Sequence, residues 1–143
     1  MDREQGQSLV ELGVSFLLLV YLLSGAVEFG IIFFQYVQLR DAAQEGALYG
    51  SMFPSDTASI VGRVRGSSQS PIDLYSPDVD ISILTNNGEK ANTDACEADA
   101  ITITVQYPHK VFMPFIPTLL GQDVIMLDGR VTNTVLQPVC QGS

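Results

Sequence analysis

The feature that most constrains this chain is a long apolar run near its N-terminus. Residues 12–27 read LGVSFLLLVYLLSGAV without a charge, and after Glu28 the run resumes as FGIIFF to Phe34. At about 1.5 Å per residue, a helix over this stretch covers about 34 Å, enough for a hydrocarbon core of about 30 Å. The uncharged part alone falls short, so Glu28 belongs inside the segment or at its far edge. We therefore expect one membrane-spanning helix over about residues 12–34.

A cleaved secretory signal is the main alternative for this segment. The triplet SGA at 24–26 offers the small residues that a signal peptidase needs, but the preceding flank MDREQGQSLVE carries three acidic residues against Arg3. A signal peptide has a basic n-region, and its apolar part is shorter than the run found here. The segment is therefore expected to remain as an anchor.

Small and polar residues gather on one side of the expected helix. They are Tyr21, Ser24, Gly25, Glu28 and Gln35. Such a stripe on an apolar helix usually faces protein, which makes it a candidate helix-packing surface. Two interpretations of Glu28 stay open: it marks the interfacial end of a tilted anchor, or it packs against another helix.

Helical character continues beyond the apolar run and then stops. Alternating alanines and charges extend the helix to Gly50 and Pro54, which end it. Ser55 is a good N-cap for a short helix from Asp56 to about Val64, and the polar residues 66–71 read as a linker. Gly46 and Gly50 could serve close helix packing, although a flexible helix end is the simpler interpretation.

The second half of the chain alternates apolar and polar residues as half-buried strands do. Strands are expected at Asp78–Leu84, Ala100–Tyr107 and Val124–Val135, the last with a bend or bulge at Asp128-Gly129. The segment PHKVFMPFIPTLLG, residues 108–121, contains three prolines and is expected to be irregular. Its apolar residues are Val111, Phe112, Met113, Phe115 and Ile116. In the favoured interpretation they pack on the chain's own sheet; the alternatives are that they contact the membrane surface or another subunit.

These elements together predict an α+β chain. A long N-terminal helix would run to residue 53, with its membrane-spanning part over about residues 12–34. Residues 54–143 would form a small domain outside the cytoplasm, with the short helix and an antiparallel sheet of about three to four strands.

Charge and motifs exclude several function classes. Seven Lys and Arg stand against sixteen Asp and Glu, a net charge of −9, which repels nucleic acid. The chain has no phosphate-binding glycine motif, and its two cysteines lack the spacing of a zinc site. We expect no catalytic residues, no metal and no cofactor.

Two features that could suggest chemistry have simpler interpretations. His109, the only histidine, has no nucleophile beside it and is expected at the surface. A run of acidic residues lacks the spacing of a calcium loop and is expected to be a solvated face; it comprises Asp73, Asp78, Asp80, Glu89, Asp94, Glu97 and Asp99.

The spacing of Gly6 and Glu11 ahead of the apolar run resembles the class III signal of type IV pilins. The segments GQSLVEL, GAVEFG, RDAAQEGALYGS and ITITVQYPHKVFMPFIPTLLG, in that order, resemble the TadE-like proteins of tight-adherence (Tad/Flp) pilus systems. The resemblance implies a minor pseudopilin that a prepilin peptidase cuts after Gly6, so that residues 1–6 form a leader peptide. The mature chain would then begin at Gln7 with a transmembrane, pilin-like helix over residues 7–53. It also implies a single-pass protein of the cytoplasmic membrane that meets lipid first and later other pilin-like subunits or copies of itself, with the Tad secretion machinery as a further partner.

Glu11 stays within the mature helix in this interpretation. Buried among apolar helices, its carboxylate would need a cation, and the new amino terminus of a neighbouring subunit at Gln7 could supply one. The pair would set the register of assembly, which leucine packing alone cannot do. The function expected is that of a pilus subunit or assembly factor; a membrane-tethered binding module that enters no filament is the alternative.

Cys96 and Cys140 are predicted to form a disulfide. Cys96 precedes the second expected strand and Cys140 follows the third, so antiparallel neighbours bring both to one end of the sheet. A domain outside the cytoplasm also meets oxidising conditions.

Overall fold

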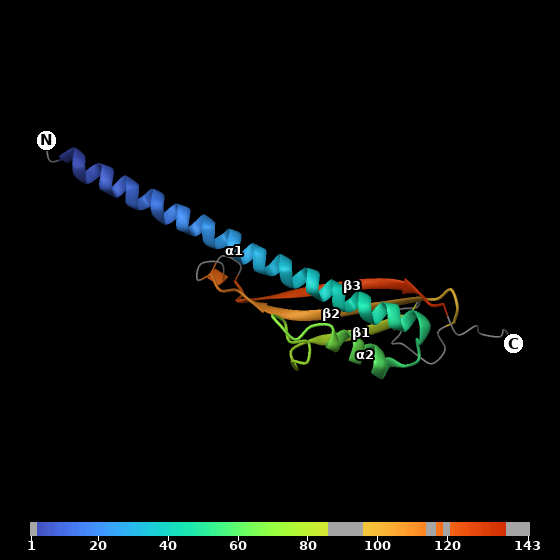
Figure 1. Cartoon of the computed structure of the whole chain (residues 1–143). Helices are drawn as coiled ribbons and strands as arrows, with labels where there is room; N and C mark the ends of the chain where they lie inside the picture. The colour runs from blue at the N-terminus through green and yellow to red at the C-terminus, as the bar shows by residue number, and fades with distance from the viewer. Residues whose placement is uncertain (1–2, 86–95, 114–116, 119–120, 137–143) are drawn as a thin grey trace.

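A computed structural model describes residues 3–85, 96–113, 117–118 and 121–136 of the chain. Two helices precede a sheet of three strands, which confirms the expected α+β fold (Figure 1). The elements are α1 (Arg3–Met52), α2 (Thr57–Gly66), β1 (Asp80–Thr85), β2 (Ala100–Lys110) and β3 (Val124–Thr134).

Helix α1 is one continuous rod with two different environments. Its N-terminal half projects away from the rest of the molecule, and its C-terminal half lies along the sheet (Figure 1). The helix ends at Met52, two residues before Pro54, whose ring cannot continue a helix. The C-terminal half of α1 is therefore part of the folded domain as well as the continuation of the apolar segment.

The sheet is antiparallel, with β2 between β1 and β3. Ile103 faces Ile83 on one neighbour and Val131 on the other. The expected alternation is confirmed, because Ile101, Ile103 and Val105 are all fully buried.

Strand β2 is longer than the sequence predicts. It continues through Pro108 to Lys110, although prolines were expected to prevent a regular element there. The reason is that β1 pairs with β2 only as far as Gln106, so among the described strands only β3 lies beside the end of β2. Proline, which lacks an N–H, is tolerated where a strand has no partner to receive that hydrogen bond.

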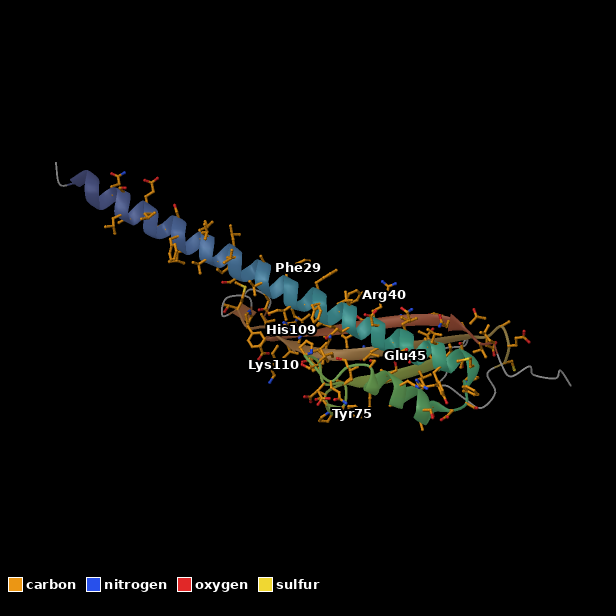
Figure 2. The ribbon with its side chains drawn as sticks, viewed as in Figure 1. Phe29, Arg40, Glu45, Tyr75, His109 and Lys110 are labelled. Carbon is orange, nitrogen blue, oxygen red and sulfur yellow. The ribbon has the colours of Figure 1, made fainter. Side chains whose placement is uncertain are left out.

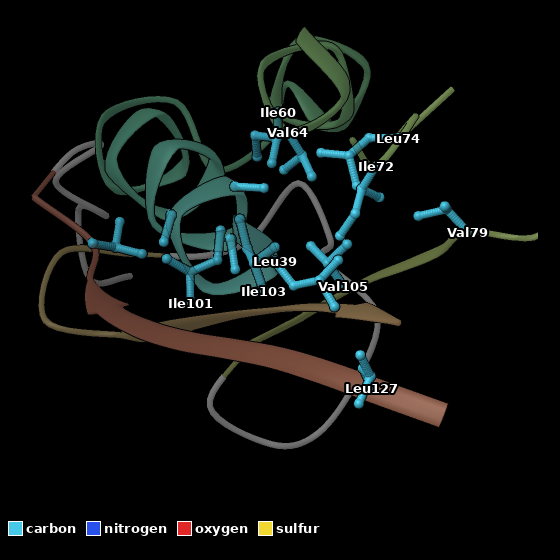
Figure 3. Packing of buried hydrophobic residues seen from close by; sticks show 14 residues of the cluster. Leu39, Ile60, Val64, Ile72, Leu74, Val79, Ile101, Ile103, Val105 and Leu127 are labelled. Atoms are coloured by element: carbon cyan, nitrogen blue, oxygen red, sulfur yellow. The ribbon is translucent and has the colours of Figure 1, made fainter. Parts of the chain in front are cut away.

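The core lies between the C-terminal half of α1, helix α2 and one face of the sheet (Figure 3). The buried alanines Ala42, Ala43 and Ala47 on α1 let the helix approach the strands closely. Leu39 is the large residue of α1 that is buried with them. Ile60 and Val64 of α2 close the core from the other side. Ile72 and Leu74, which follow the polar segment 66–71, are also fully buried and complete it.

Three glycines are sites of close approach, and for Gly46 and Gly50 this is the alternative that the sequence analysis did not favour. A Cβ at Gly46 would meet Val64, and one at Gly50 would lie 2.8 Å from Ile101 Cδ1, so the expected flexible helix end is wrong. A Cβ at Gly129 would lie 2.6 Å from the backbone nitrogen of Arg40. The bend or bulge predicted at Asp128-Gly129 is also wrong, because β3 keeps an unbroken register with β2 there. Glycine at 129 lets β3 pack directly on the α1 backbone.

Helix α2 begins one residue later than predicted. Asp56, not Ser55, is its N-cap, and its carboxylate accepts a hydrogen bond from the Ser59 backbone N–H at 3.1 Å. The hydrogen bonds from the Ser59 side chain and backbone lower the pKa of Asp56 below its usual value of 3.8. The Tyr49 hydroxyl also donates to this carboxylate, at 3.4 Å, which ties α2 to α1.

Candidate functional site

The projecting half of α1 is the most unusual surface of the molecule. By length and composition it is the one described helix that could cross a membrane, with a mean hydropathy of 2.2 in its apolar part and only 6% of that part buried. Leucines, valines and phenylalanines along it are 45–73% exposed from Leu9 to Leu23. Such a surface needs a cover of lipid or protein.

The residues predicted for peptidase processing lie on this rod. Gly6, Gln7 and Glu11 are exposed, and Glu11 has no hydrogen-bond or ion-pair partner among the described residues. The structure neither brings them together with another group nor tests their processing, which stays a prediction.

The predicted helix-packing stripe divides into two parts. Tyr21 is 41% exposed, Ser24 and Gly25 are half-buried, and the Ser24 hydroxyl donates back to the Val20 carbonyl at 2.8 Å. Glu28 and Gln35, by contrast, are buried under the chain's own domain. The stripe therefore faces protein at its C-terminal end, and the protein is this chain.

Glu28 marks the place where the rod meets the domain. His109 Nε2 lies 2.8 Å from Glu28 Oε1, and the Phe112 backbone N–H donates to the same oxygen at 3.2 Å. The oxygens of an ionised carboxylate only accept hydrogen bonds, so the His109 tautomer that fits an ionised Glu28 carries its proton on Nε2 and donates it. Only 5% of Glu28 and 1% of His109 remain exposed. The predicted surface histidine is thus wrong: its ring points from β2 toward α1 (Figure 2).

A weak sequence signal for this pair exists. Glu28 is an acid in an apolar run, and a buried acid needs a donor. His109 is the single histidine and stands beside an apolar segment. The two are 81 residues apart, so only the antiparallel return of β2 along α1 brings them together.

A groove lies on the rod side of this junction. Its volume is about 500 Å³, and α1 residues from Leu17 to Ile31 form one wall while Phe112 and Met113 form the other. Met113 is 6% exposed and lines this groove together with α1, whereas Phe112 is exposed. Phe115 and Ile116 lie outside the described residues.

The structure bears only in part on the predictions about metal ligands and about the disulfide. Within the described part of the chain, no three His, Cys, Asp or Glu side chains gather as metal ligands; Glu89 and Asp94 lie outside it. Cys140 also lies outside it, so the predicted disulfide is not tested. Backbone hydrogen bonds between the turn after Cys96 and Val135, from Ala98 N to Val135 O at 3.0 Å, agree with the topology on which that prediction depends.

Comparison with known families identifies the first third of the chain. Residues 6–48 match the family model described as TadE-like protein. The resemblance to TadE-like proteins is confirmed. The matched segment contains Gly6, Glu11 and Glu28 and ends inside the part of α1 that packs on the sheet. No curated protein and no solved structure matches the chain.

The TadE-like match relates the chain to tight-adherence pili. This is a structural and non-enzymatic kind of family, and a membrane-anchoring helix fits it. The match covers most of α1 and does not extend to α2 or the sheet.

Proposed function

We propose that this TadE-like chain is a pilin-like subunit of a Tad/Flp pilus, acting in pilus assembly or as a filament subunit through packing of its N-terminal helix. The observation that carries the proposal is the length of the apolar face. Large apolar side chains stay exposed from Leu9 to Val37. At about 1.5 Å per residue this face is about 42 Å long, more than a hydrocarbon core of about 30 Å covers.

The excess apolar surface lies on the half of α1 that carries the domain. Phe29, Phe33 and Phe34 are 69%, 58% and 54% exposed, on the side of the helix turned away from the sheet. Lipid can cover the projecting half, but the domain-bearing half needs protein at least in part. Helices of other pilin-like subunits, or of further copies of this chain, have the matching apolar surface.

The proposal includes a location and an order of events. The chain would first sit in the cytoplasmic membrane as a single-pass protein, with the sheet and α2 outside the cytoplasm. A prepilin peptidase would cut after Gly6, and the Tad secretion machinery would then move the helix from lipid into contact with neighbouring subunits. The result would be a filament on the cell surface that acts in adhesion.

Site-specific photo-crosslinking in cells tests the proposal. A photoreactive residue at Phe33, on the outward face, should form adducts with a pilin-like chain or a second copy, identified by mass. The same residue at Tyr75, which is exposed on the domain away from the outward face of α1 (Figure 2), should not. Isolated surface filaments should contain the chain if it is a filament subunit, and should lack it if it acts only in assembly.

A tethered binding module is the second candidate, and one observation favours it. A recess of about 600 Å³ lies between α1 and α2, with Asp41, Glu45 and Arg63 in its wall. Arg63 and Glu45 are 3.6 Å apart and largely exposed, so both remain available to a polar ligand. Crosslinks from Phe33 only to lipid, together with filaments free of this chain, would favour the module over the pilin-like subunit.

A further inference from the structure

The segment that follows β2 carries the most exposed large apolar side chain of the described residues. Phe112 is 78% exposed, more than Leu9 at 73% on the projecting rod. It is also held in place, because its backbone N–H donates to Glu28 and the adjoining Met113 is buried. Phe112 also lines one groove with exposed apolar side chains of α1, so the two form a contiguous apolar patch, and such a patch marks a contact with another molecule.

The hydrogen bond to Glu28 sets the level of Phe112 along α1. If the membrane span covers residues 12–34, Glu28 lies about 9 Å inside the outer edge of the hydrocarbon, at 1.5 Å per residue. If the span ends at Glu28, Phe112 lies at that edge. In both cases the Phe112 side chain is within reach of lipid, and the left end of the sheet in Figure 1, where β2 ends beside α1, faces the membrane.

We propose that residues 110–113 form a second membrane contact, in which Phe112 enters the outer hydrocarbon layer and the exposed Lys110 faces lipid phosphates. This inference rests on the membrane anchoring in the proposed function. Lysine beside an aromatic residue suits the interface, because the ammonium group stays with the headgroups while the ring enters the apolar layer. The contact fixes the tilt of the domain on the membrane before assembly.

The groove beside Phe112 fits a lipid acyl chain. It extends along α1 from Leu17 to Ile31, which is about 21 Å at the rise of an α-helix. Most of its lining is apolar, and its α1 wall belongs to the stretch expected to span the membrane, so an acyl chain of the surrounding lipid can lie along it.

The absence of tryptophan from the sequence makes a direct test available. Phe112→Trp introduces a single indole, and the full chain is reconstituted in phosphatidylcholine vesicles whose acyl chains carry bromine, a contact quencher of indole fluorescence. We expect the emission of this variant to fall strongly when the bromine is placed near the headgroup end of the acyl chain, and less when it is placed near the methyl end.

Two matched variants separate this inference from the membrane anchor itself. Leu18→Trp, on the projecting rod, should be quenched most by bromine deep in the bilayer, and Leu48→Trp, at the far end of α1, should not be quenched. Quenching of Leu18→Trp without any quenching of Phe112→Trp would overturn the second contact and leave the anchor standing. No quenching of Leu18→Trp would overturn both. Quenching of Phe112→Trp that falls when wild-type protein, which has no tryptophan, is added, while the quenching of Leu18→Trp does not fall, would assign the groove to a second copy and refute the lipid.

Discussion

At the scale of single residues, Glu28 has a double role in the energetics of the chain. An acid in an apolar helix opposes membrane insertion, and the partners of Glu28 come from β2 and from the segment that follows it. Folding of the sheet against α1 therefore supplies the donors that the apolar run lacks. The pair also fixes the end of β2 on the helix at the level where the projecting rod begins.

His109→Phe tests this interaction, since it keeps a ring in the buried position and removes the Nε2 donor. One buried oxygen then loses its stronger partner, which should lower the free energy of unfolding by about 1–3 kcal/mol. Unfolding of the full chain in detergent micelles measures it, with the exposed neighbour Lys110→Ala as the control, expected within about 0.5 kcal/mol of wild type. Adding Glu28→Leu to His109→Phe should recover most of the loss. Equal stability of His109→Phe and Lys110→Ala would contradict the assignment.

Two glycine positions provide a second comparison. Gly129→Ala places a Cβ 2.6 Å from the Arg40 nitrogen and 2.7 Å from the Leu39 oxygen, both backbone atoms that cannot rotate away. We expect a loss of about 1–3 kcal/mol or more from this overpacking. Gly62→Ala, in α2, meets nothing within 4 Å and should instead stabilise by about 0.5–1 kcal/mol. The denaturant midpoints of the two variants and of the wild type measure these changes in stability. A Gly129→Ala protein as stable as wild type would show that β3 does not touch the α1 backbone.

At the scale of elements, α2 depends on its N-cap. The folded-state pKa of Asp56 is lowered by its hydrogen bonds, so its stabilising effect is present above the unfolded value and is lost as pH falls through the lowered folded value. We expect Asp56→Ala to lower the melting temperature at neutral pH. Asp56→Asn should keep the cap and lose this pH dependence, because its amide oxygen accepts the same bond without titrating. Melting curves at neutral pH and below the lowered pKa would show the wild-type advantage over Asp56→Ala shrinking with acid; an unchanged advantage would refute the role of the charge.

The elements themselves follow from local patterns in the sequence, and their contacts do not. Period-two alternation at Ile101, Ile103 and Val105 and the apolar run of α1 predict a strand and a helix within a few residues. Pairing of Glu28 with His109 could not be predicted in the same way, because it depends on how far β2 returns along α1. Gly129 was assigned to a bend for a similar reason: a glycine needed for close approach has the same local signal as one needed for a turn.

At the scale of the whole molecule, the predicted disulfide would close the domain. Val135 N donates to Asp99 O at 2.7 Å, which fixes the chain near Cys96 beside the end of β3. A bridge from Cys96 to Cys140 would close a loop of about 44 residues and stabilise by roughly 4 kcal/mol in the chain-entropy model. We expect mass spectrometry of non-reduced peptides to find the linked pair. Alkylation of both cysteines without prior reduction would refute the bridge and weaken the placement of the domain outside the cytoplasm.

Glu11 and Glu28, the two carboxylates at and within the apolar segment, differ in their hydrogen-bond partners. Glu28 has donors within its own chain, whereas Glu11 is exposed and has no hydrogen-bond or ion-pair partner among the described residues. In the proposed assembly this carboxylate would lie among apolar helices and would require a cation or donors, which another molecule would supply. The proposed source is the amino terminus at Gln7 of a neighbouring subunit, exposed by cleavage after Gly6.

Replacing each acid separately tests this difference in living cells. Glu11→Ala should leave membrane insertion intact or improved, because it removes a buried charge, while it weakens association between subunits. Glu28→Ala should instead destabilise the domain, with association reduced only as far as folding is. N-terminal sequencing of the wild-type chain from cells with an active prepilin peptidase should find Gln7 first, and an intact Met1–Gly6 segment would refute cleavage. Crosslinking from Phe33 measures association; equal yields for wild type and Glu11→Ala would show that the carboxylate of Glu11 does not set the register of the assembly.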